Sequence, residues 1–225
     1  MTLKANAFGA GVIVLVVLPF VIGDFRTVQL ATVGAYFIAI LGLDVLTGHS
    51  GQISLGHGAF MAVGGYTTAI LMSQHGVRDL LTIPIAAGVA GGIGLLAGVP
   101  ALRLSGLYLA LATFGISATF AGVAGALYAI NVAYVSPDTF PIQLSLYLLV
   151  GAVVGFFGSI WGALLGALLI QFLADLVGLI PHVDTKQGGP TTLFFGLLLV
   201  VLMLVLPLVL RVASRFANRG YLGAR

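Results

Sequence analysis

The 225-residue chain is 60% hydrophobic and only 7% charged, with a formal net charge of +3. Soluble domains carry about 25% charged residues, so this composition excludes a water-soluble globular protein. The chain has no cysteine, which excludes disulfides and thiolate metal sites. Its positive charge comes mainly from four arginines that follow the last apolar run, a pattern typical of a cytoplasmic anchor rather than of a surface that binds nucleic acid.

Apolar stretches long enough to cross a bilayer as helices recur along the whole chain. Since a span needs about 20 mostly apolar residues, they predict an all-α, polytopic integral membrane protein with about eight transmembrane helices. The candidate spans are roughly residues 7–23, 28–46, 59–74, 81–100, 105–130, 143–158, 160–180 and 190–210. No hydrophilic block is long enough for a soluble domain, so residues 1–225 are predicted to form a single transmembrane domain.

Several of these spans have more than one interpretation. The stretch 7–23 has the outline of a signal peptide, but it lacks an Ala-x-Ala-like cleavage site, and we interpret it as a retained span. The stretch 59–74 is short and is either tilted or partly re-entrant. Residues 105–130 form either one tilted helix or two pieces broken near Gly115. The sixth and seventh spans are separated by one Gly-Ser pair, so they form either a tight hairpin or one re-entrant element.

The lysines and arginines of the short loops indicate the orientation. With the C-terminus inside, Lys4, Arg103 and the tail arginines lie on the cytoplasmic side, whereas Arg26, Arg78 and Lys186 lie outside. Cytoplasmic loops carry the excess of Lys and Arg in membrane proteins. Both termini are therefore predicted to be cytoplasmic.

Glycines recur at three- and four-residue steps in two stretches of the chain. Small residues at this spacing let helix backbones approach closely in lipid, where no hydrophobic force drives helices together. The predicted helix-packing glycines are Gly122, Gly125, Gly151, Gly155, Gly158, Gly162 and Gly166. We assign them to packing within the chain, with a dedicated subunit interface as the alternative.

A polar, glycine-rich island interrupts the apolar sequence. Residues 47–58 read Thr-Gly-His-Ser-Gly-Gln-Ile-Ser-Leu-Gly-His-Gly. Backbone in a bilayer must satisfy its own hydrogen bonds, so such an island lies either at the surface or along a wet cavity enclosed by protein. Glycine-interrupted segments in multi-span proteins indicate a transport pathway. A short polar loop between two spans is the alternative interpretation.

Four segments in a fixed order carry a family resemblance. The first segment is residues 43–67, and its most specific part is Gly-Gln-Ile-Ser-Leu-Gly-His-Gly-Ala-Phe at 51–60. The second, residues 103–113, reads Arg-Leu-Ser-Gly-Leu-Tyr-Leu-Ala-Leu-Ala-Thr, and the third, residues 121–138, begins Ala-Gly-Val-Ala-Gly-Ala-Leu-Tyr-Ala. The fourth, residues 155–166, reads Gly-Phe-Phe-Gly-Ser-Ile-Trp-Gly-Ala-Leu-Leu-Gly. Together they resemble the permease subunit of branched-chain amino acid ABC importers. The resemblance extends from about residue 30 to about residue 180.

The resemblance implies a non-enzymatic, multi-pass subunit of the cell inner membrane that forms a translocation path with a second permease. It also implies cytoplasmic ATPase subunits and a soluble substrate-binding protein that delivers leucine, isoleucine, valine or a related small substrate. No cofactor is expected on the chain itself, because neither Lys4 nor Lys186 stands in a Gly-x-x-x-x-Gly-Lys-Ser/Thr loop. ATP would be bound by the partner subunits.

Four side chains in and near the polar island are candidates for the substrate path: Asp44, Gln52, Ser54 and His57. An ionisable side chain inside lipid costs about 2.5–3.5 kcal/mol, so it usually faces a cavity or a partner, although Asp44 lies near a span end where it can reach water. The other three offer the dipoles that suit a zwitterionic substrate, and hydrogen bonds between helices explain them equally well. No metal site is predicted, because His49 and His57 have no third ligand nearby.

The chain departs from the family pattern between Phe114 and Ala121. Family members carry a long additional stretch there, including the charged loop that docks on the ATPase, and this chain contains no Glu at all. A non-coupled remnant and a stand-alone secondary transporter or channel are therefore alternative functions. An intramembrane serine protease that uses Ser54 and a histidine is a further alternative, but the Ser-Leu-Gly-His order matches no nucleophile signature.

Overall fold

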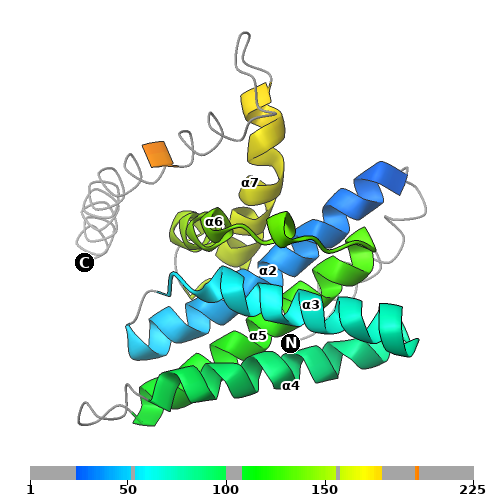
Figure 1. Ribbon diagram of the computed structural model, residues 1–225. Helices are drawn as coiled ribbons and strands as arrows, with labels where there is room; N and C mark the ends of the chain where they lie inside the picture. The colour runs from blue at the N-terminus through cyan, green and yellow to red at the C-terminus, as the bar shows by residue number, and fades with distance from the viewer. Residues whose placement is uncertain (1–23, 52–53, 100–107, 156–157, 179–195, 198–225) are drawn as a thin grey trace, which may run out of the picture.

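The computed structural model describes residues 24–51, 54–99, 108–155, 158–178 and 196–197 (Figure 1). This described part is helical and contains no strand, which confirms the predicted all-α class. Its elements are α2 (Asp24–Ser50), α3 (His57–His75), α4 (Asp79–Gly98), α5 (Tyr108–Val132), the short 3-10 helix η2 (Pro137–Thr139), α6 (Ile142–Val154) and α7 (Ile160–Gly178).

Four stretches of the described residues are long and apolar enough to cross a membrane. They are Phe25–Gly48, Asp79–Gly98, Leu111–Val132 and Pro137–Val154. These spans confirm a polytopic membrane protein. The predicted first span, 7–23, lies outside the described residues, as does the eighth, 190–210, apart from residues 196–197, so the total of about eight helices stays a prediction.

The fifth predicted span is one helix. α5 continues from Tyr108 to Val132 without a break at Gly115. A β-carbon at Gly115 would lie 2.5 Å from Cδ2 of Leu95 in α4. The glycine therefore serves the close packing of α4 against α5 and does not divide the helix.

α6 and α7 are two helices that pack against each other as a hairpin, and whether this hairpin is re-entrant stays a prediction. Gly158 in the turn has a φ of +84°, a left-handed conformation that glycine adopts without steric cost. Ser159 Oγ accepts a hydrogen bond of 3.2 Å from the backbone N–H of Gly162 and so caps the start of α7. A β-carbon on Gly158 would meet nothing within 4 Å in the part of the chain that the structure describes. Gly158 is thus a turn glycine, and its prediction as a packing glycine needs this correction.

The other six predicted packing glycines lie at helix contacts inside the chain. Gly155 faces the backbone of Gly162 across the hairpin, and Gly151 faces Gly166 one turn further along. In α5, Gly122 lies against the backbone of α4, and Gly125 lies against the backbone of α3. Close approach of helix backbones is the stabilising contact that small residues make possible in lipid.

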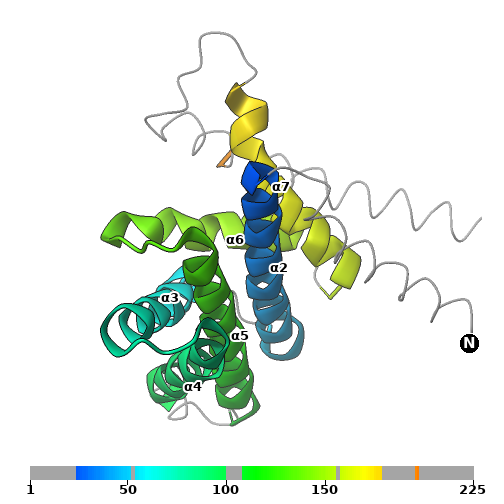
Figure 2. The same cartoon turned by 90° about the vertical axis from the view of Figure 1, so that its right-hand side faces the viewer.

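α5 is the centre of one group of helices, in which it packs against α2, α3 and α4 (Figure 1). α2 lies between α5 and α7, and α6 crosses α2 at a steep angle (Figure 2). Apolar side chains from α2, α3 and α6 fill the space between these elements, including Ile40, Leu43, Met61 and Leu148. α2 therefore contacts the group centred on α5 and also the pair formed by α6 and α7.

Candidate functional site

The polar island is divided between two helices and a short link. Its first residues complete α2, and Gly51, with a φ of +64°, ends that helix by donating its N–H to the carbonyl of Thr47 at 2.9 Å. α3 begins at His57. Gln52 lies outside the described residues, so its predicted place on a substrate path stays a prediction.

His57 is almost fully buried at the first residue of α3, with 1% of its surface exposed. Its Nε2 lies 2.8 Å from the carbonyl oxygen of Ala39 in α2, and its Nδ1 lies 3.4 Å from Oγ of Ser117 in α5. A carbonyl oxygen only accepts hydrogen bonds, so Nε2 carries the proton in this contact and Nδ1 pairs with the serine hydroxyl. One imidazole ring thereby links three helices.

Two glycines make this close arrangement possible. A β-carbon on Gly42 would lie 2.6 Å from Cβ of Phe120 and 3.3 Å from Cε1 of His57. A β-carbon on Gly58 would lie 2.7 Å from Oγ of Ser145, the atom that accepts the Gly58 N–H at 3.0 Å and joins α6 to the cluster. We call this cluster the His57 junction, and it consists of Ala39, Gly42, His57, Gly58, Ser117 and Ser145.

The other two described candidates, Asp44 and Ser54, are also buried, at 8% and 9% exposure. The backbone of Gly158, in the turn between α6 and α7, hydrogen-bonds to the Asp44 carboxylate. The Oδ1 atom of Asp44 has no hydrogen-bond partner among the described residues. An ionised carboxylate with an unpaired oxygen raises the free energy of the fold inside the membrane, unless water, a proton or a partner reaches that oxygen. The assignment of Asp44, Ser54 and His57 to a substrate path remains a prediction.

The arrangement of Ser54 and His57 does not support a serine protease. A nucleophilic serine needs a base within hydrogen-bond reach. The two ring nitrogens of His57 are instead engaged by Ala39 and Ser117. Ser117 is itself 1% exposed, so no substrate reaches it beside the histidine.

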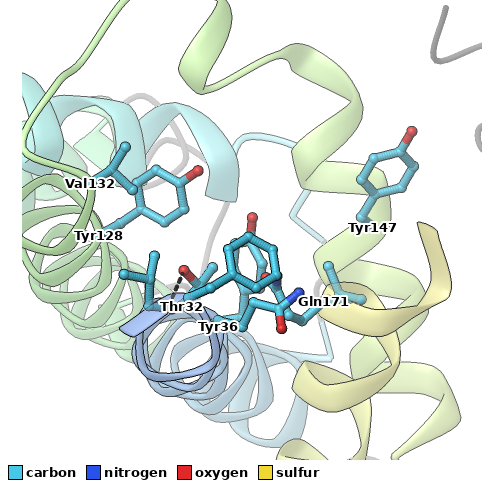
Figure 3. A pocket seen from close by; sticks show the side chains of 10 residues that line it. Thr32, Tyr36, Tyr128, Val132, Tyr147 and Gln171 are labelled. Atoms are coloured by element: carbon cyan, nitrogen blue, oxygen red, sulfur yellow. Dashed lines mark hydrogen bonds between the residues drawn. The ribbon is translucent and has the colours of Figure 1, made fainter. Parts of the chain in front are cut away.

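A pocket of about 430 Å³ opens between α2, α5, α6 and α7, and none of the predicted path residues lines it. Pockets that bind small molecules typically measure about 300–1,000 Å³. Its lining consists of apolar and of neutral hydrogen-bonding side chains, with no charged residue: Phe25, Val28, Gln29, Thr32, Tyr36, Tyr128, Val132, Tyr147, Ile170 and Gln171. Figure 3 shows Tyr128 and Tyr147 on opposite sides of the pocket, with Thr32 and Tyr36 between them.

Hydrogen bonds fix the wall between α2 and α5. Thr32 Oγ1 donates to the carbonyl of Val28 at 3.0 Å, the bond drawn in Figure 3. Asn131 Nδ2 donates to the same carbonyl at 3.0 Å and to Thr32 Oγ1 at 3.1 Å. The rings of Tyr36 and Tyr128 lie 6.1 Å apart and tilted by 31°. The polar lining is therefore held in place by contacts between helices.

This pocket was not predicted from the sequence, although the sequence of α2 contains one signal of it. Phe25, Gln29, Thr32 and Tyr36 follow one another at steps of four, three and four residues, which places them on one face of α2. A polar stripe on one face of an apolar span marks a helix that faces a partner or a cavity. The remaining walls come from residues 128–171, and no local pattern indicates that they meet this face.

Comparison with known proteins decides the family. The family model described as "Branched-chain amino acid transport system / permease component" matches residues 27–113 and 106–207, which together cover more than half of the chain. The chain belongs to this family. Membership confirms the resemblance found in the sequence. The two matches overlap at residues 106–113, close to Phe114, where we expect the chain to depart from the family pattern, and α5 continues through this point.

Two curated relatives carry the same description. The chain is 41% identical over 116 residues to the high-affinity branched-chain amino acid transport system permease protein LivM of Escherichia coli (strain K12). It is 39% identical over 116 residues to LivM of Salmonella typhimurium. Each match covers 51% of this chain and 27% of the relative, so the matched part spans about a quarter of the relative's length. No solved structure matches the chain.

Proposed function

We propose that the chain is a membrane-spanning permease subunit of an ATP-driven importer for branched-chain or related small amino acids. The observation that carries this proposal is the family match over residues 27–113 and 106–207. The four apolar stretches of the described residues support a subunit that crosses the membrane several times. In this function the chain forms the translocation path with a second permease, and the path opens alternately to each side as the ATPases close and open.

The proposal includes partners and a location. A soluble binding protein delivers the substrate, cytoplasmic ATPases bind ATP, and the chain itself carries no cofactor. The complex lies in the cell inner membrane with both termini of the chain in the cytoplasm. The distribution of Lys and Arg supports this orientation, with Arg26 and Arg78 at the outer ends of α2 and α4.

The contact between this subunit and the ATPase distinguishes the proposed function from its alternatives. The chain departs from the expected family pattern between Phe114 and Ala121, and both residues lie inside the continuous helix α5. The docking loop that family members carry there has no counterpart between Phe114 and Ala121. An ATPase that docks on this subunit must therefore contact a surface other than that loop. A non-coupled remnant and a stand-alone transporter would instead bind no ATPase.

The experiment is a pull-down of the tagged full chain, co-expressed with the proposed second permease and ATPases and solubilised in detergent. We expect recovery of both partners, together with uptake of labelled leucine into vesicles that contain the complex, the binding protein and ATP. The matched control is an ATPase variant that binds ATP without hydrolysing it, which should abolish uptake and leave the pull-down unchanged. Recovery of the permease without the ATPase, or uptake that persists in the control, would overturn ATP-driven import.

A further inference from the structure

The pocket between α2, α5, α6 and α7 is lined by polar side chains from all four helices. Thr32 and Asn131 already join α2 to α5 through hydrogen bonds of 3.0–3.1 Å. Two glutamines and three tyrosines from the four helices also line this space, and Tyr36 and Tyr128 hydrogen-bond to each other across α2 and α5. Polar side chains within membrane-spanning segments are costly, so those that converge on a cavity indicate a site for a polar solute.

We propose that this pocket is a binding subsite for a neutral, zwitterionic amino acid with an apolar side chain, at the external end of the translocation path. The proposal rests on the proposed transport function, and it adds the place where this subunit contacts the substrate. It differs from the path predicted from the sequence, which runs through residues 44–57.

The pocket lining matches both the apolar side chain and the charged backbone groups of such an amino acid. Val28, Val132 and Ile170 offer apolar contact to an aliphatic side chain. The amides of Gln29 and Gln171, like the tyrosine hydroxyls, contain both donors and acceptors, so they pair with an ammonium and with a carboxylate. The pocket lining has no fixed charge, which disfavours an acidic or basic amino acid because its extra charge would have no partner.

The position of the pocket agrees with a role at the external side. It lies beside the first turns of α2 and the last turn of α5, ends that the distribution of Lys and Arg places outside. Arg26, an exposed residue on the same turns of α2, donates from Nη1 to Oε1 of Gln29 at 3.4 Å. The polar lining argues against a lipid tail as the natural occupant.

The absence of cysteine from the chain provides a direct test. In the assembled complex in nanodiscs, Gln171→Cys is modified with a water-soluble thiol reagent, and the mass increase of this subunit is followed over time. We expect leucine at ten times its dissociation constant to slow the modification about tenfold, by simple competition for the pocket. Aspartate at the same concentration should not slow it. Tyr134→Cys is the matched control, because Tyr134 is 72% exposed and does not line the pocket, and leucine should leave its modification unchanged.

Each other outcome overturns the proposal in a recognisable way. A thiol at position 171 that reacts at the same rate with and without leucine, in a complex that still takes up leucine, would reject the subsite and leave the transport function standing. A thiol that never reacts would show that lipid, another part of the chain or another subunit fills the pocket. A native complex that takes up no leucine at all would reject the transport function itself.

A second variant pair tests the pocket through transport. Val132→Trp adds bulk to the lining at a residue that is 39% exposed, so it narrows the pocket with little effect on the core. Val89→Trp is the same substitution at a residue of α4 that is 40% exposed and lies away from the pocket. We expect Val132→Trp to raise the KM for leucine uptake about tenfold or more, which corresponds to about 1.4 kcal/mol of lost binding, and Val89→Trp to leave the KM unchanged. Equal KM values for the two variants, with equal recovery of assembled complex, would overturn the subsite.

Discussion

The two halves of α2 use polar contacts in opposite ways. In the C-terminal half, Ala39 and Gly42 belong to the His57 junction, where a buried imidazole has a partner on each ring nitrogen. In the N-terminal half, Gln29 and Thr32 line an open pocket of about 430 Å³. The C-terminal half is therefore closely packed against its neighbours, whereas the N-terminal half, although hydrogen-bonded to α5, also borders a pocket.

This difference shows that a polar residue in a span does not by itself indicate a substrate path. His57 lies in the most distinctive motif of the sequence, yet its contacts are those of a structural link between helices. Gln171 lies in no motif, yet it lines a pocket. Four substitutions, from the largest expected effect to the smallest, test whether the two halves of α2 differ as their contacts indicate.

Gly42→Leu should have the largest effect. A β-carbon at this position already lies 2.6 Å from Cβ of Phe120 and 3.0 Å from the carbonyl of Ser117, so a leucine forces α2 and α5 apart. We expect a loss of about 3 kcal/mol or more, the upper end of the usual cost of overpacking, and little folded protein. Gel filtration of the detergent-solubilised chain measures the folded fraction.

Gly34→Leu is the matched control in the same helix, because a β-carbon there meets nothing within 4 Å among the described residues. It should leave the folded fraction unchanged. Comparable losses from Gly34→Leu and Gly42→Leu would mean that the two halves of α2 are equally packed.

His57→Ala comes second. It removes the hydrogen bonds to Ala39 and Ser117 and leaves a cavity where three helices meet. We expect a destabilisation of about 2–3 kcal/mol, measured as a lower midpoint of thermal unfolding in detergent. His75→Ala, at the exposed last residue of the same helix, should change the midpoint little. If His57→Ala unfolds at the wild-type temperature but abolishes leucine uptake, His57 lines the substrate path as the sequence suggested.

Ser145→Ala comes third and tests the contact of α6 with the junction. It leaves the backbone N–H of Gly58 without its acceptor at 3.0 Å. The expected cost is about 1 kcal/mol, the usual contribution of one buried hydrogen bond. Ser159→Ala offers a comparison, because its hydroxyl accepts a bond of 3.2 Å from Gly162 in the hairpin turn. A wild-type unfolding midpoint for Ser145→Ala would show that α6 is not held by this bond.

Thr32→Val should have the smallest effect on stability and a separate effect on transport. It removes the interhelical bond of 3.1 Å from Asn131, worth about 0.6 kcal/mol on average in a membrane protein. Thr67→Val is the matched control, because among the described residues the Thr67 hydroxyl bonds only to the Val63 carbonyl of its own helix, at 2.7 Å. Thr32→Val should raise the KM for leucine uptake and Thr67→Val should not. An unchanged KM for Thr32→Val would place the transported substrate elsewhere.

Much of the fold could be predicted because hydrophobic length is a local property. A stretch of about 20 apolar residues specifies a span wherever it occurs, and α2, α4 and α5 follow the predicted stretches closely. The helix ends were harder to place. α2 continues through Thr47 to Ser50, into the polar island, because Gly51 and not the first glycine of the island ends the helix.

The candidate site was harder to predict, for a physical reason. A path predicted from one polar island assumes that neighbours in sequence share a cavity, whereas the pocket joins residues 25–36 to residues 128–171. The sequence showed which residues were polar within apolar surroundings. It did not show which of them face one another.

The sequence by itself determined the membrane class, the family and the spacing of the packing glycines, because composition, motif order and helical period are all properties of the local chain. Only the tertiary structure decided that His57 is a link between helices, that Gly158 belongs to a turn, and that α2 presents a polar face to an open pocket. These assignments depend on which helix lies opposite each residue, and that is settled by the packing of all the described helices together.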